Sequence, residues 1–381
     1  MCTWISSPHS TWRARISPKS LIVAAACARP FVRAAAASGR RVIAADVFCD
    51  IDTRRAADKA IQLAYRPGGF DADDVRTQLL PLAAEGVGLT YGSGFETQPE
   101  LLEELALHFQ LFGNQPETVR ITKDPGRFFS MLSRLGIPAP EVSMGLPISS
   151  PGWLTKLIGG SGGTHIMPAT ECREAGRYYQ RNVPGQSVSL LFLTDGSKVE
   201  VVGYNLQLVA PLPTMPYRYG GAVSHFPLPE NIRHSMRQAV EKITAELGLR
   251  GLNSLDCIVA DEGFWVLEVN PRLSATFALY DVGRSGAALF EAHMQACQGI
   301  MPGPLPPEPS QAHLIYYAPF DLAVPAAMEW PDWVADVPEP ASLVEAEQPL
   351  CTVSASATGA NQALALARAR VEELTRLVNN F

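Results

Sequence analysis

The chain has 381 residues, of which 47% are hydrophobic and 18% are charged. This balance is typical of a globular protein with room for about two or three packed units, and it excludes a disordered chain. The formal net charge of -7 gives no general attraction to nucleic acid or to an anionic membrane surface, so neither is expected as a partner.

The start of the chain and its cysteines bear on location. Residues 1–19 are polar and unpatterned, which predicts a disordered tail or an overextended start. The apolar run at 21–28 is too short to span a bilayer. A secretory leader is the alternative, but a first buried strand fits the helical and strand-like runs that follow. The seven cysteines form no Cys-x-x-Cys or Cys/His cluster, which argues against a zinc site or a disulfide framework and favours a cytoplasmic protein.

Residues 20–113 alternate short β-rich runs with helical stretches. This alternation predicts a parallel sheet with helices on its faces, a Rossmann-like domain. The expected strands lie at 21–26, 41–47 and 88–91. The expected helices lie near 31–37, 75–85 and 99–109. Asp46 ends the second strand, where a dinucleotide site would hold a ribose, but Cys27-Ala28-Arg29-Pro30 stands in place of Gly-x-Gly-x-x-Gly. We therefore expect no nicotinamide cofactor, and residues 91–96 should end a strand at the open edge of the sheet.

A helix and a glycine-rich loop follow. Asp124-Pro125-Gly126 predicts a helix start, and Leu135-Gly136-Ile137-Pro138 predicts its stop. Trp153–Leu157 reads as a strand that leads into the loop Ile158-Gly159-Gly160-Ser161-Gly162-Gly163-Thr164-His165-Ile166. Glycines let backbone amides approach a polyanion and permit positive φ angles, although many such loops are only flexible turns. The loop is no Walker A motif, because no Gly-Lys-Ser/Thr closes it.

The remaining pattern is mostly antiparallel. Residues 177–188 predict strand, turn and strand, and residues 217–222 predict a loop. Further strands are expected at 188–193, 199–208, 314–319 and 350–355, with helices at 232–247, 280–297 and 361–378. The Pro-rich stretch 302–309 reads as a linker, and the segment 310–381 is expected to pack on the part before it.

The segment from Gly251 to Arg272 is the most informative. Asp261-Glu262-Gly263 predicts a hairpin turn that pairs residues 255–260 with 264–269 and brings Asp256 beside Glu268. Asn270 follows at the strand period of two, so these three oxygen-bearing side chains can meet one hard cation such as Mg²⁺. Arg272 lies one period further on, where it could hold a phosphate or carboxylate. The alternative is a hairpin whose acids face solvent.

The string Glu268-Val269-Asn270-Pro271-Arg272, with Asp256 ahead of it, resembles the metal-binding signature of ATP-grasp enzymes. The resemblance implies ATP and two Mg²⁺ ions (or Mn²⁺) bridged by Glu268 and Asn270. It also implies a mixed α/β fold, α+β in its nucleotide-binding part. The implied units are a Rossmann-like domain at 20–113, an ATP-grasp domain at 114–300 with a small lid at about 120–185 and a large half at about 186–300, and a small β-rich C-terminal segment.

The same resemblance implies roles for other residues. Lys156 would contact ATP phosphates, although the proline common after this lysine is Leu157 here. A second basic contact to phosphate would be Lys123, with Arg120 as the next candidate, and the alternative is that these two are a solvated basic pair. Arg218 would clamp a substrate carboxylate, and Arg272 would stabilise a tetrahedral oxyanion. The phosphate-covering loop would be Gly160, Ser161, Gly162 and Gly163. The hinge that holds adenine through main-chain groups would be Gln180, Arg181, Asn182 and Val183, with Arg181 where many relatives have glutamate.

The implied function is an ATP-dependent ligase that activates a substrate carboxylate as an acyl phosphate and joins it to an amine. The layout is similar to ATP-grasp ligases of one-carbon cofactor biosynthesis, such as tyramine:glutamate ligase. Two alternatives stay open: a bicarbonate-activating relative of the carboxylases, and an ATP-binding regulatory module without catalysis. The expected partners are small-molecule carboxylates and amines, and a homodimer is an open alternative to a monomer.

Overall fold

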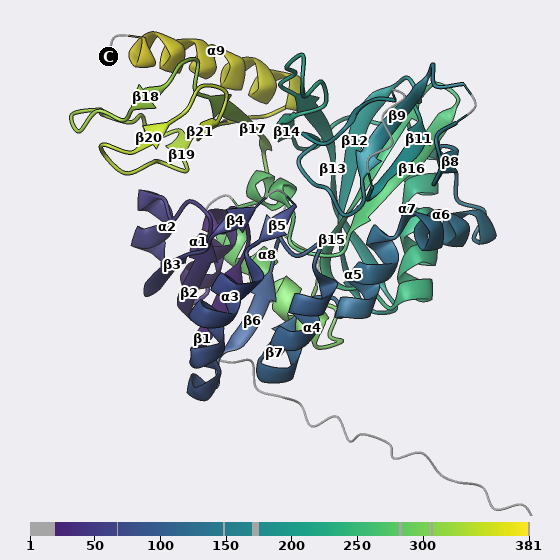
Figure 1. Cartoon of the computed structure of the whole chain (residues 1–381), viewed down its shortest axis with the longest axis horizontal. Coiled ribbons are helices and arrows are strands. Elements are labelled where there is room, and N and C mark those ends of the chain that lie inside the picture. The colour runs from purple at the N-terminus through teal and green to yellow at the C-terminus, as the bar shows by residue number, and fades with distance from the viewer. Residues whose placement is uncertain are drawn as a thin grey trace, which may run out of the picture.

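A computed structural model of the chain describes residues 20–66, 68–147, 149–169, 175–281, 284–303, 305 and 308–379. The expected tail, parts of the Pro-rich linker, Cys2 and Cys172 lie outside these residues. The described part comprises an N-terminal unit, a small sheet, and a large sheet that continues into the C-terminal segment (Figure 1). None of the helices in these ranges is long and apolar enough to cross a membrane.

The N-terminal unit is built on a parallel sheet in the order β3-β2-β1-β6-β7. Leu21, Ile22 and Val23 of the central strand are fully buried, because a parallel strand between layers of helices packs both of its faces. The three predicted strands are confirmed, whereas β3 and β7 were missed because they are too short to show a period. The elements are β1 (Ser20–Ala24), α1 (Arg29–Ala37), β2 (Arg41–Asp46), α2 (Ile51–Ala56), β3 (Lys59–Gln62), β4 (Tyr65–Arg66), β5 (Gly69–Phe70), α3 (Ala72–Leu79), the 3-10 helix η1 (Leu80–Glu85), β6 (Gly88–Tyr91), α4 (Pro99–His108) and β7 (Gln110–Phe112).

Two short helices and a small antiparallel sheet come next. Asp124 accepts a hydrogen bond from the Arg127 N–H at 2.9 Å and caps the second helix, as its position predicted. The small sheet has the order β10-β9-β11-β8. The elements are α5 (Pro116–Lys123), α6 (Pro125–Arg134), β8 (Val142–Ser143), β9 (Trp153–Leu157), β10 (Met167–Pro168) and β11 (Arg177–Arg181).

The large sheet has the order β16-β15-β12-β13-β14-β17-β21-β19. Strand β12 packs both faces: Val188 and Leu190 point to the core shared with α7, and Leu191 and Leu193 point to the core shared with α8 and α1. The elements are β12 (Gln186–Asp195), β13 (Val199–Val209), β14 (Tyr219–Val223), α7 (Glu230–Leu247), β15 (Arg250–Ala260), β16 (Gly263–Asn270), the 3-10 helix η2 (Ala275–Leu279), α8 (Arg284–Cys297), β17 (Ser310–Tyr317), β18 (Leu322–Ala323), β19 (Val334–Ala335), β20 (Leu343–Val344), β21 (Pro349–Ala357) and α9 (Ala360–Val378).

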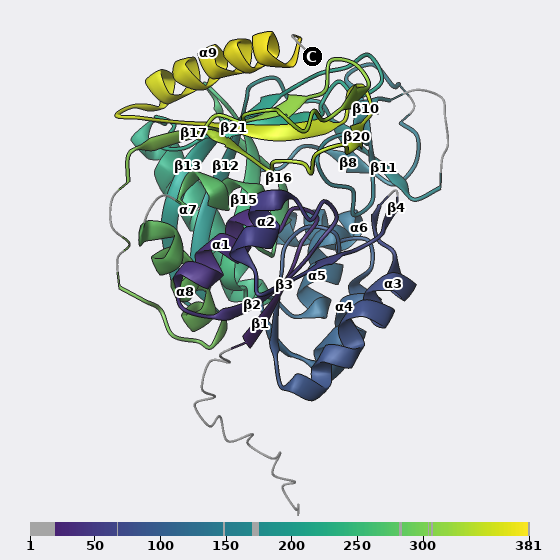
Figure 2. The same ribbon diagram turned by 90° about the vertical axis from the view of Figure 1, so that its left-hand side faces the viewer.

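The C-terminal segment extends the large sheet. Strand β17 pairs with β14, and α9 covers β17 and β21 (Figure 2). The loop expected at 217–222 is therefore wrong from Tyr219 onward, where β14 begins. Two adjacent glycines hid this strand, and the packing explains one of them: a Cβ on Gly221 would lie 2.2 Å from the His313 carbonyl oxygen of β17.

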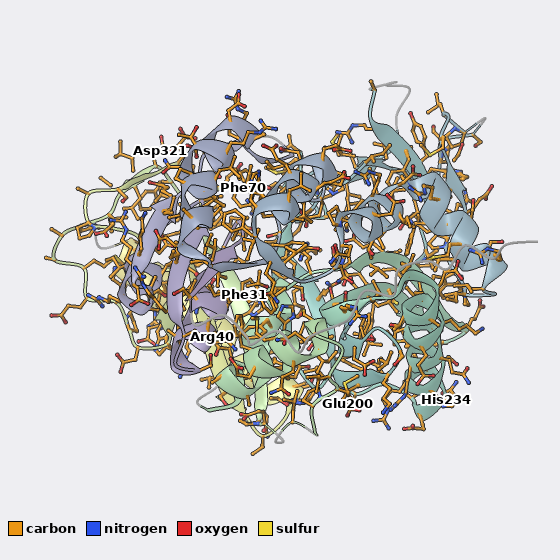
Figure 3. The ribbon with its side chains drawn as sticks, turned by 90° about the horizontal axis from the view of Figure 1, so that it is seen from below. Phe31, Arg40, Phe70, Glu200, His234 and Asp321 are labelled. Carbon is orange, nitrogen blue, oxygen red and sulfur yellow. The ribbon has the colours of Figure 1, made fainter. Side chains whose placement is uncertain are left out.

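Side-chain contacts tie the N-terminal unit to the part around α8. The rings of Phe31 and Phe277 pack edge to face with centroids 5.2 Å apart. Arg40 Nε donates to Glu291 Oε1 at 2.7 Å. Phe31 and Arg40 mark this boundary in Figure 3. The unit is therefore held against the large sheet on the side of α1.

Candidate functional site

The hairpin predicted from residues 255–269 is confirmed. Asp256 of β15 lies opposite Glu268 of β16, and Ser254 lies opposite Asn270. The Asn270 Nδ2 group donates to Asp256 Oδ2 at 3.1 Å, and Gln207 Nε2 of β13 donates to Asp256 Oδ1 at 3.2 Å. The two carboxylates and the amide are thus gathered on one face, as their spacing predicted.

Lys123 reaches this group from the last turn of α5. Its Nζ lies 3.0 Å from Glu268 Oε2 and 2.9 Å from Asn270 Oδ1. Lys123 is 145 residues away from Glu268 in the chain, so only the fold brings the two together. The contact shows that the pocket between the carboxylate and the amide oxygen favours a positive charge.

The two strand carboxylates differ in charge state. Burial and the neighbouring Glu268 raise the pKa of Asp256 above its ordinary value. Burial alone would also raise the pKa of Glu268, but Lys123 and Lys156 outweigh burial and hold that pKa below its usual range. Glu268 is therefore the more firmly ionised of the two carboxylates, and Asp256 is the first to be protonated as the pH falls.

Arg272 links the hairpin to the N-terminal unit through Glu96. Arg272 Nε donates to Glu96 Oε1 at 2.5 Å, and its other groups donate to Asn270 Oδ1 and the Leu273 carbonyl oxygen. A guanidinium has five N–H donors, so two remain for a ligand. Glu96 was not singled out from the sequence, although it ends the 91–96 segment expected at the open edge of the sheet.

The glycine loop is closed over the hairpin. Its Gly163 has a φ of +72°, and a Cβ there would lie 2.0 Å from the Tyr217 carbonyl oxygen. The Tyr219 N–H donates to the Gly162 carbonyl oxygen at 3.0 Å. A Cβ on Gly159 would meet the Thr97 side chain at 2.9 Å. Glycine is thus required where the loop touches both the large sheet and the N-terminal unit.

His165, for which the sequence showed no partner, shapes this loop. Its Nδ1 accepts a hydrogen bond from the Leu157 N–H at 3.1 Å, which assigns the ring proton to Nε2. Burial lowers the pKa of His165 to about 4, so the ring is neutral. A Cβ on Gly160 would lie 2.5 Å from this ring, which explains the glycine there. The histidine acts as a structural support of the loop.

Lys156 lies beneath the glycine loop on β9. It is buried, and burial lowers its pKa. No hydrogen bond or ion pair within the described ranges engages its amino group, in contrast to Lys123. The narrow cavity that it lines has a volume of about 60 Å³ and also contacts Lys123, Glu268 and the loop residues Gly160, Ser161, Gly162 and Gly163. Such a volume is far below the roughly 300 Å³ needed by a drug-sized ligand, so a ligand of that size would fit here only if the loop opened.

The expected hinge lies at the end of β11. Gln180 is buried, and its Nε2 group finds no hydrogen-bond acceptor in the described structure. It stands two residues from Tyr178, which pairs with Lys156, so Gln180 and Lys156 share a face of the small sheet. Arg181 instead donates to the Pro151 carbonyl oxygen at 3.2 Å, and the Asn182 N–H binds the Gly152 carbonyl oxygen. Val183 continues the turn into β12.

Arg218 is not the exposed loop residue that its sequence context suggested. It is buried, its Nε donates to the Ala210 carbonyl oxygen at 2.9 Å, and one terminal nitrogen donates to the Glu347 carbonyl oxygen at 2.8 Å. Its guanidinium lies 3.6 Å from the ring centre of Tyr317. These contacts support the fold around Tyr317, and the role of Arg218 as a substrate clamp stays a prediction.

A second, much larger cavity opens beside the hairpin. Its volume is about 780 Å³, and Asp256, Glu268, Asn270 and Arg272 are among the residues that line it. The N-terminal unit contributes Cys27, Phe48 and Asp50, and the C-terminal segment contributes Ile315, Tyr317 and Leu350. The sequence pattern did not predict that the C-terminal segment would form a wall of this cavity.

The donor set of the hairpin fits a hard divalent cation that completes its shell elsewhere. In the described part of the chain, no cluster of three or more His, Cys, Asp or Glu side chains is arranged to hold a metal. Asp256, Glu268 and Asn270 supply two carboxylates and one amide oxygen. Mg²⁺ usually takes one or two carboxylates from the protein and the rest of its ligands from phosphates and water, so this set suits it.

Comparisons with known proteins agree with this geometry. Residues 123–276 match the family described as the ATP-grasp domain. The carbamoyl phosphate synthase large chain of Vibrio cholerae is 26% identical over 216 residues, which cover 50% of this chain and 20% of that protein. The match thus spans about a fifth of the length of these curated relatives.

Solved structures resemble nearly the whole chain. The L-amino acid ligase from Bacillus licheniformis has a TM-score of 0.70 at 14% identity, covering 94% of this chain and 98% of that protein. The biotin carboxylase domain of 2-oxoglutarate carboxylase from Hydrogenobacter thermophilus, solved with MgADP and bicarbonate, also has a TM-score of 0.70 at 14% identity, covering 92% and 89%. At such identities the likeness shows the fold, a mixed α/β architecture. Lys123, the glycine loop and the hairpin all fall inside residues 123–276, and this part of the chain is therefore an ATP-grasp domain.

Proposed function

We propose that this protein is an ATP-dependent ligase that activates a substrate carboxylate as an acyl phosphate and joins it to an amine. One observation carries the proposal: Glu268, Ser161 and Gly162 line both the narrow cavity under the glycine loop and the cavity of about 780 Å³. A nucleotide with its phosphates under the loop would present the terminal phosphate to a molecule in the large cavity.

The residues on the nucleotide side suit a triphosphate. Asp256, Glu268 and Asn270 would hold Mg²⁺ or Mn²⁺, which neutralises charge on the phosphates. Lys156 has an amino group without a partner in the described residues, and its burial strengthens its attraction for an anion. Gln180, with its unpaired buried amide, is the side chain we assign to the adenine end.

The proposed reaction has two steps. A carboxylate oxygen of the substrate attacks the terminal phosphorus of ATP, the bond to ADP breaks, and an acyl phosphate forms. An amine nitrogen then attacks the acyl carbon, the bond to phosphate breaks, and the nitrogen loses a proton as the amide forms. Arg272 lines the large cavity with two N–H groups not used by the protein, and we assign them to the developing oxyanion.

The closed glycine loop protects the intermediate. The contacts of Gly159 with Thr97 and of Gly163 with Tyr217 seal the loop on two sides. Excluding water limits hydrolysis of an acyl phosphate and strengthens the electrostatic contacts inside the site. We therefore infer that each turnover requires the loop to open and close.

Bicarbonate activation is the second candidate, because the Hydrogenobacter neighbour was solved with that anion. The large cavity favours the ligase, since about 780 Å³ is far more than a bicarbonate ion fills. The five described cysteines are free thiols, which supports a cytoplasmic reaction.

The test is ADP release from Mg-ATP with single carboxylates, with and without hydroxylamine to trap an acyl phosphate as a hydroxamate. Glutamate with tyramine, other amino acids, and bicarbonate alone form separate arms. Carboxylate-dependent ADP release with matching hydroxamate is the expected result. ADP release with bicarbonate alone would favour a bicarbonate-activating enzyme. ATP binding without ADP release in every arm would indicate a non-catalytic ATP-binding module.

A further inference from the structure

The large cavity is also lined by carboxylates outside the hairpin. These are Asp50 and Asp336, and Asp46 and Asp52 lie close enough to act on Asp50. These residues come from the end of β2, the start of α2 and the turn after β19. The fold thus concentrates negative charge at one place in the cavity wall.

Three of these four carboxylates have partners that account for them. Asp46 accepts hydrogen bonds from the N–H groups of Ala28 and Cys49, at 3.2 and 2.5 Å. Asp336 Oδ1 accepts a hydrogen bond from Arg29 Nε at 2.6 Å. The remaining member, Asp52, accepts from the N–H groups of residues 336 and 337 at 2.8 and 3.2 Å. Asp46 is thus satisfied within the N-terminal unit, whereas Asp52 and Asp336 join this unit to the C-terminal segment.

Asp50 is different. Only 9% of the residue is exposed, and its carboxyl group faces the cavity. Within the described ranges no hydrogen bond or ion pair engages this carboxyl group, and it does not cap α2. The residue before it, Cys49, has a φ of +50°, a costly conformation for a residue other than glycine. The chain thus holds a buried carboxylate toward open space with nothing from the protein to satisfy it.

Nearby charge does not satisfy Asp50 either. Burial, followed by Asp336, Asp46 and Asp52, raises its pKa to about 8, and Arg29 only partly opposes this. Arg54 also lines the cavity, but it donates to the Cys49 carbonyl oxygen and lies 3.6 Å from Glu339. A cation brought to this point would therefore find an uncompensated acceptor.

The hairpin and Asp50 have different charged groups around them. Lys123, Lys156 and Arg272 lower the pKa of Glu268, although only Arg272 of these three lines the large cavity, whereas mainly carboxylates act on Asp50. Apolar side chains lie along the cavity wall: Val47, Phe48, Ile315, Leu343, Val344 and Leu350. If the proposed function brings the substrate carboxylate to the hairpin, a molecule that matched this cavity would also carry an apolar segment and a cationic group that reaches Asp50.

We infer that Asp50 binds an ammonium group of the substrate, so that the molecule activated at the hairpin carries a carboxylate and, across an apolar segment, a positive charge. This inference rests on the proposed function for the fate of the carboxylate, but not for binding of the cation. It assigns a substrate class, the amino-carboxylates, and a specificity-determining residue to the large cavity.

The probes are straight-chain amino acids of increasing length: γ-aminobutyrate, δ-aminovalerate and ε-aminocaproate. Each is paired with its ω-hydroxy counterpart, which keeps the carboxylate and removes the charge. Calorimetry measures binding in the presence of Mg-ATP, and ADP release measures turnover. We expect at least one pair in which the amino compound binds about 10-fold or more tightly, the size of a hydrogen bond to a charged group. In Asp50→Asn the preference should vanish, with binding of the hydroxy compound unchanged.

Asp73→Asn is the matched control, because it makes the same chemical change at an exposed position of the same unit. It should keep the wild-type preference. Asp50→Asn removes no hydrogen bond of the described protein, so its thermal unfolding temperature should equal or exceed that of the wild type, and its affinity for Mg-ATP should be unchanged. An equal affinity of the wild type for both members of every pair, or an undiminished preference in Asp50→Asn, would overturn the inference. Absence of ADP release with intact discrimination in binding would instead refute the proposed ligase and leave the Asp50 site standing.

Discussion

Arg272 and Glu96 form a buried ion pair between the hairpin and the N-terminal unit, with 2.5 Å between Nε and Oε1 and side-chain exposures of 9% and 5%. Glu96 also accepts a hydrogen bond from the Gly94 N–H at 2.6 Å. Burial alone would raise the pKa of Glu96, but Arg272 and then Lys123 outweigh it and lower that pKa. The N-terminal unit therefore fixes the guanidinium that lines the large cavity.

Removal of Glu96 should cost stability. Glu96→Ala leaves Arg272 buried without its carboxylate, so the free energy of unfolding should fall by about 3–5 kcal/mol. Chemical denaturation measures this. Glu103→Ala is the control, because Glu103 pairs with Arg120 at the surface, and its loss should cost no more than about 1 kcal/mol. Equal effects of the two substitutions would contradict the role of burial.

The hairpin ligands should be essential for turnover. Glu268→Gln and Asn270→Ala should each lower the rate of ADP formation by more than about 100-fold, because loss of a direct ligand exceeds the cost of losing a supporting residue. Both variants should retain the circular dichroism spectrum of the wild type. Full activity in either variant would refute the metal assignment.

Lys156 should govern the requirement for ATP. Lys156→Ala removes a buried positive charge from beneath the glycine loop, and the KM for Mg-ATP should rise by about 10- to 100-fold. Lys198→Ala, at an exposed position in the turn after β12, should leave KM unchanged. An unaltered ATP dependence of Lys156→Ala would remove this lysine from the site.

Two neighbouring glycines offer a matched pair for the closed loop. Both have positive φ angles, +69° at Gly162 and +72° at Gly163, so alanine strains the backbone at either position. Only at Gly163 would the added Cβ also meet the Tyr217 carbonyl oxygen, at 2.0 Å. Gly163→Ala should therefore raise the KM for Mg-ATP and expose the loop to proteolysis more than Gly162→Ala does. Identical behaviour of the two variants would show that the loop does not close against Tyr217.

The pKa of Asp50 makes a prediction for stability against pH. In the folded protein the pKa of Asp50 is about 8, against an ordinary value of 3.8. Between these values the folded protein binds one proton more than the unfolded chain, so this group lowers the free energy of unfolding as pH rises. The wild type and Asp50→Asn share the charged groups around residue 50, which are Asp336, Asp46, Asp52 and Arg29. The stability of Asp50→Asn relative to the wild type should therefore grow from about pH 4 to pH 8, and a constant difference across that window would contradict the assignment.

Local chemistry alone determined the hairpin, the cap at Asp124, the glycine loop and the strand that carries Lys156. Each is set by contacts within a few residues: a turn that fixes the pairing of Asp256 with Glu268, or glycines that permit positive φ angles. The same local logic failed where a partner from far along the chain decides the structure. Strand β14 was taken as part of a loop because only its pairing with β17 shows why Gly221 is there.

The tertiary structure decided which distant side chains meet at the site. It brought Lys123 to Glu268, Glu96 to Arg272, and Asp50 to the same cavity as the hairpin. It also placed the guanidinium of Arg218 against the ring of Tyr317. Sequence spacing reports the direction of a side chain along one strand or helix, whereas contacts across hundreds of residues depend on how the sheets pack, and no local pattern encodes that packing.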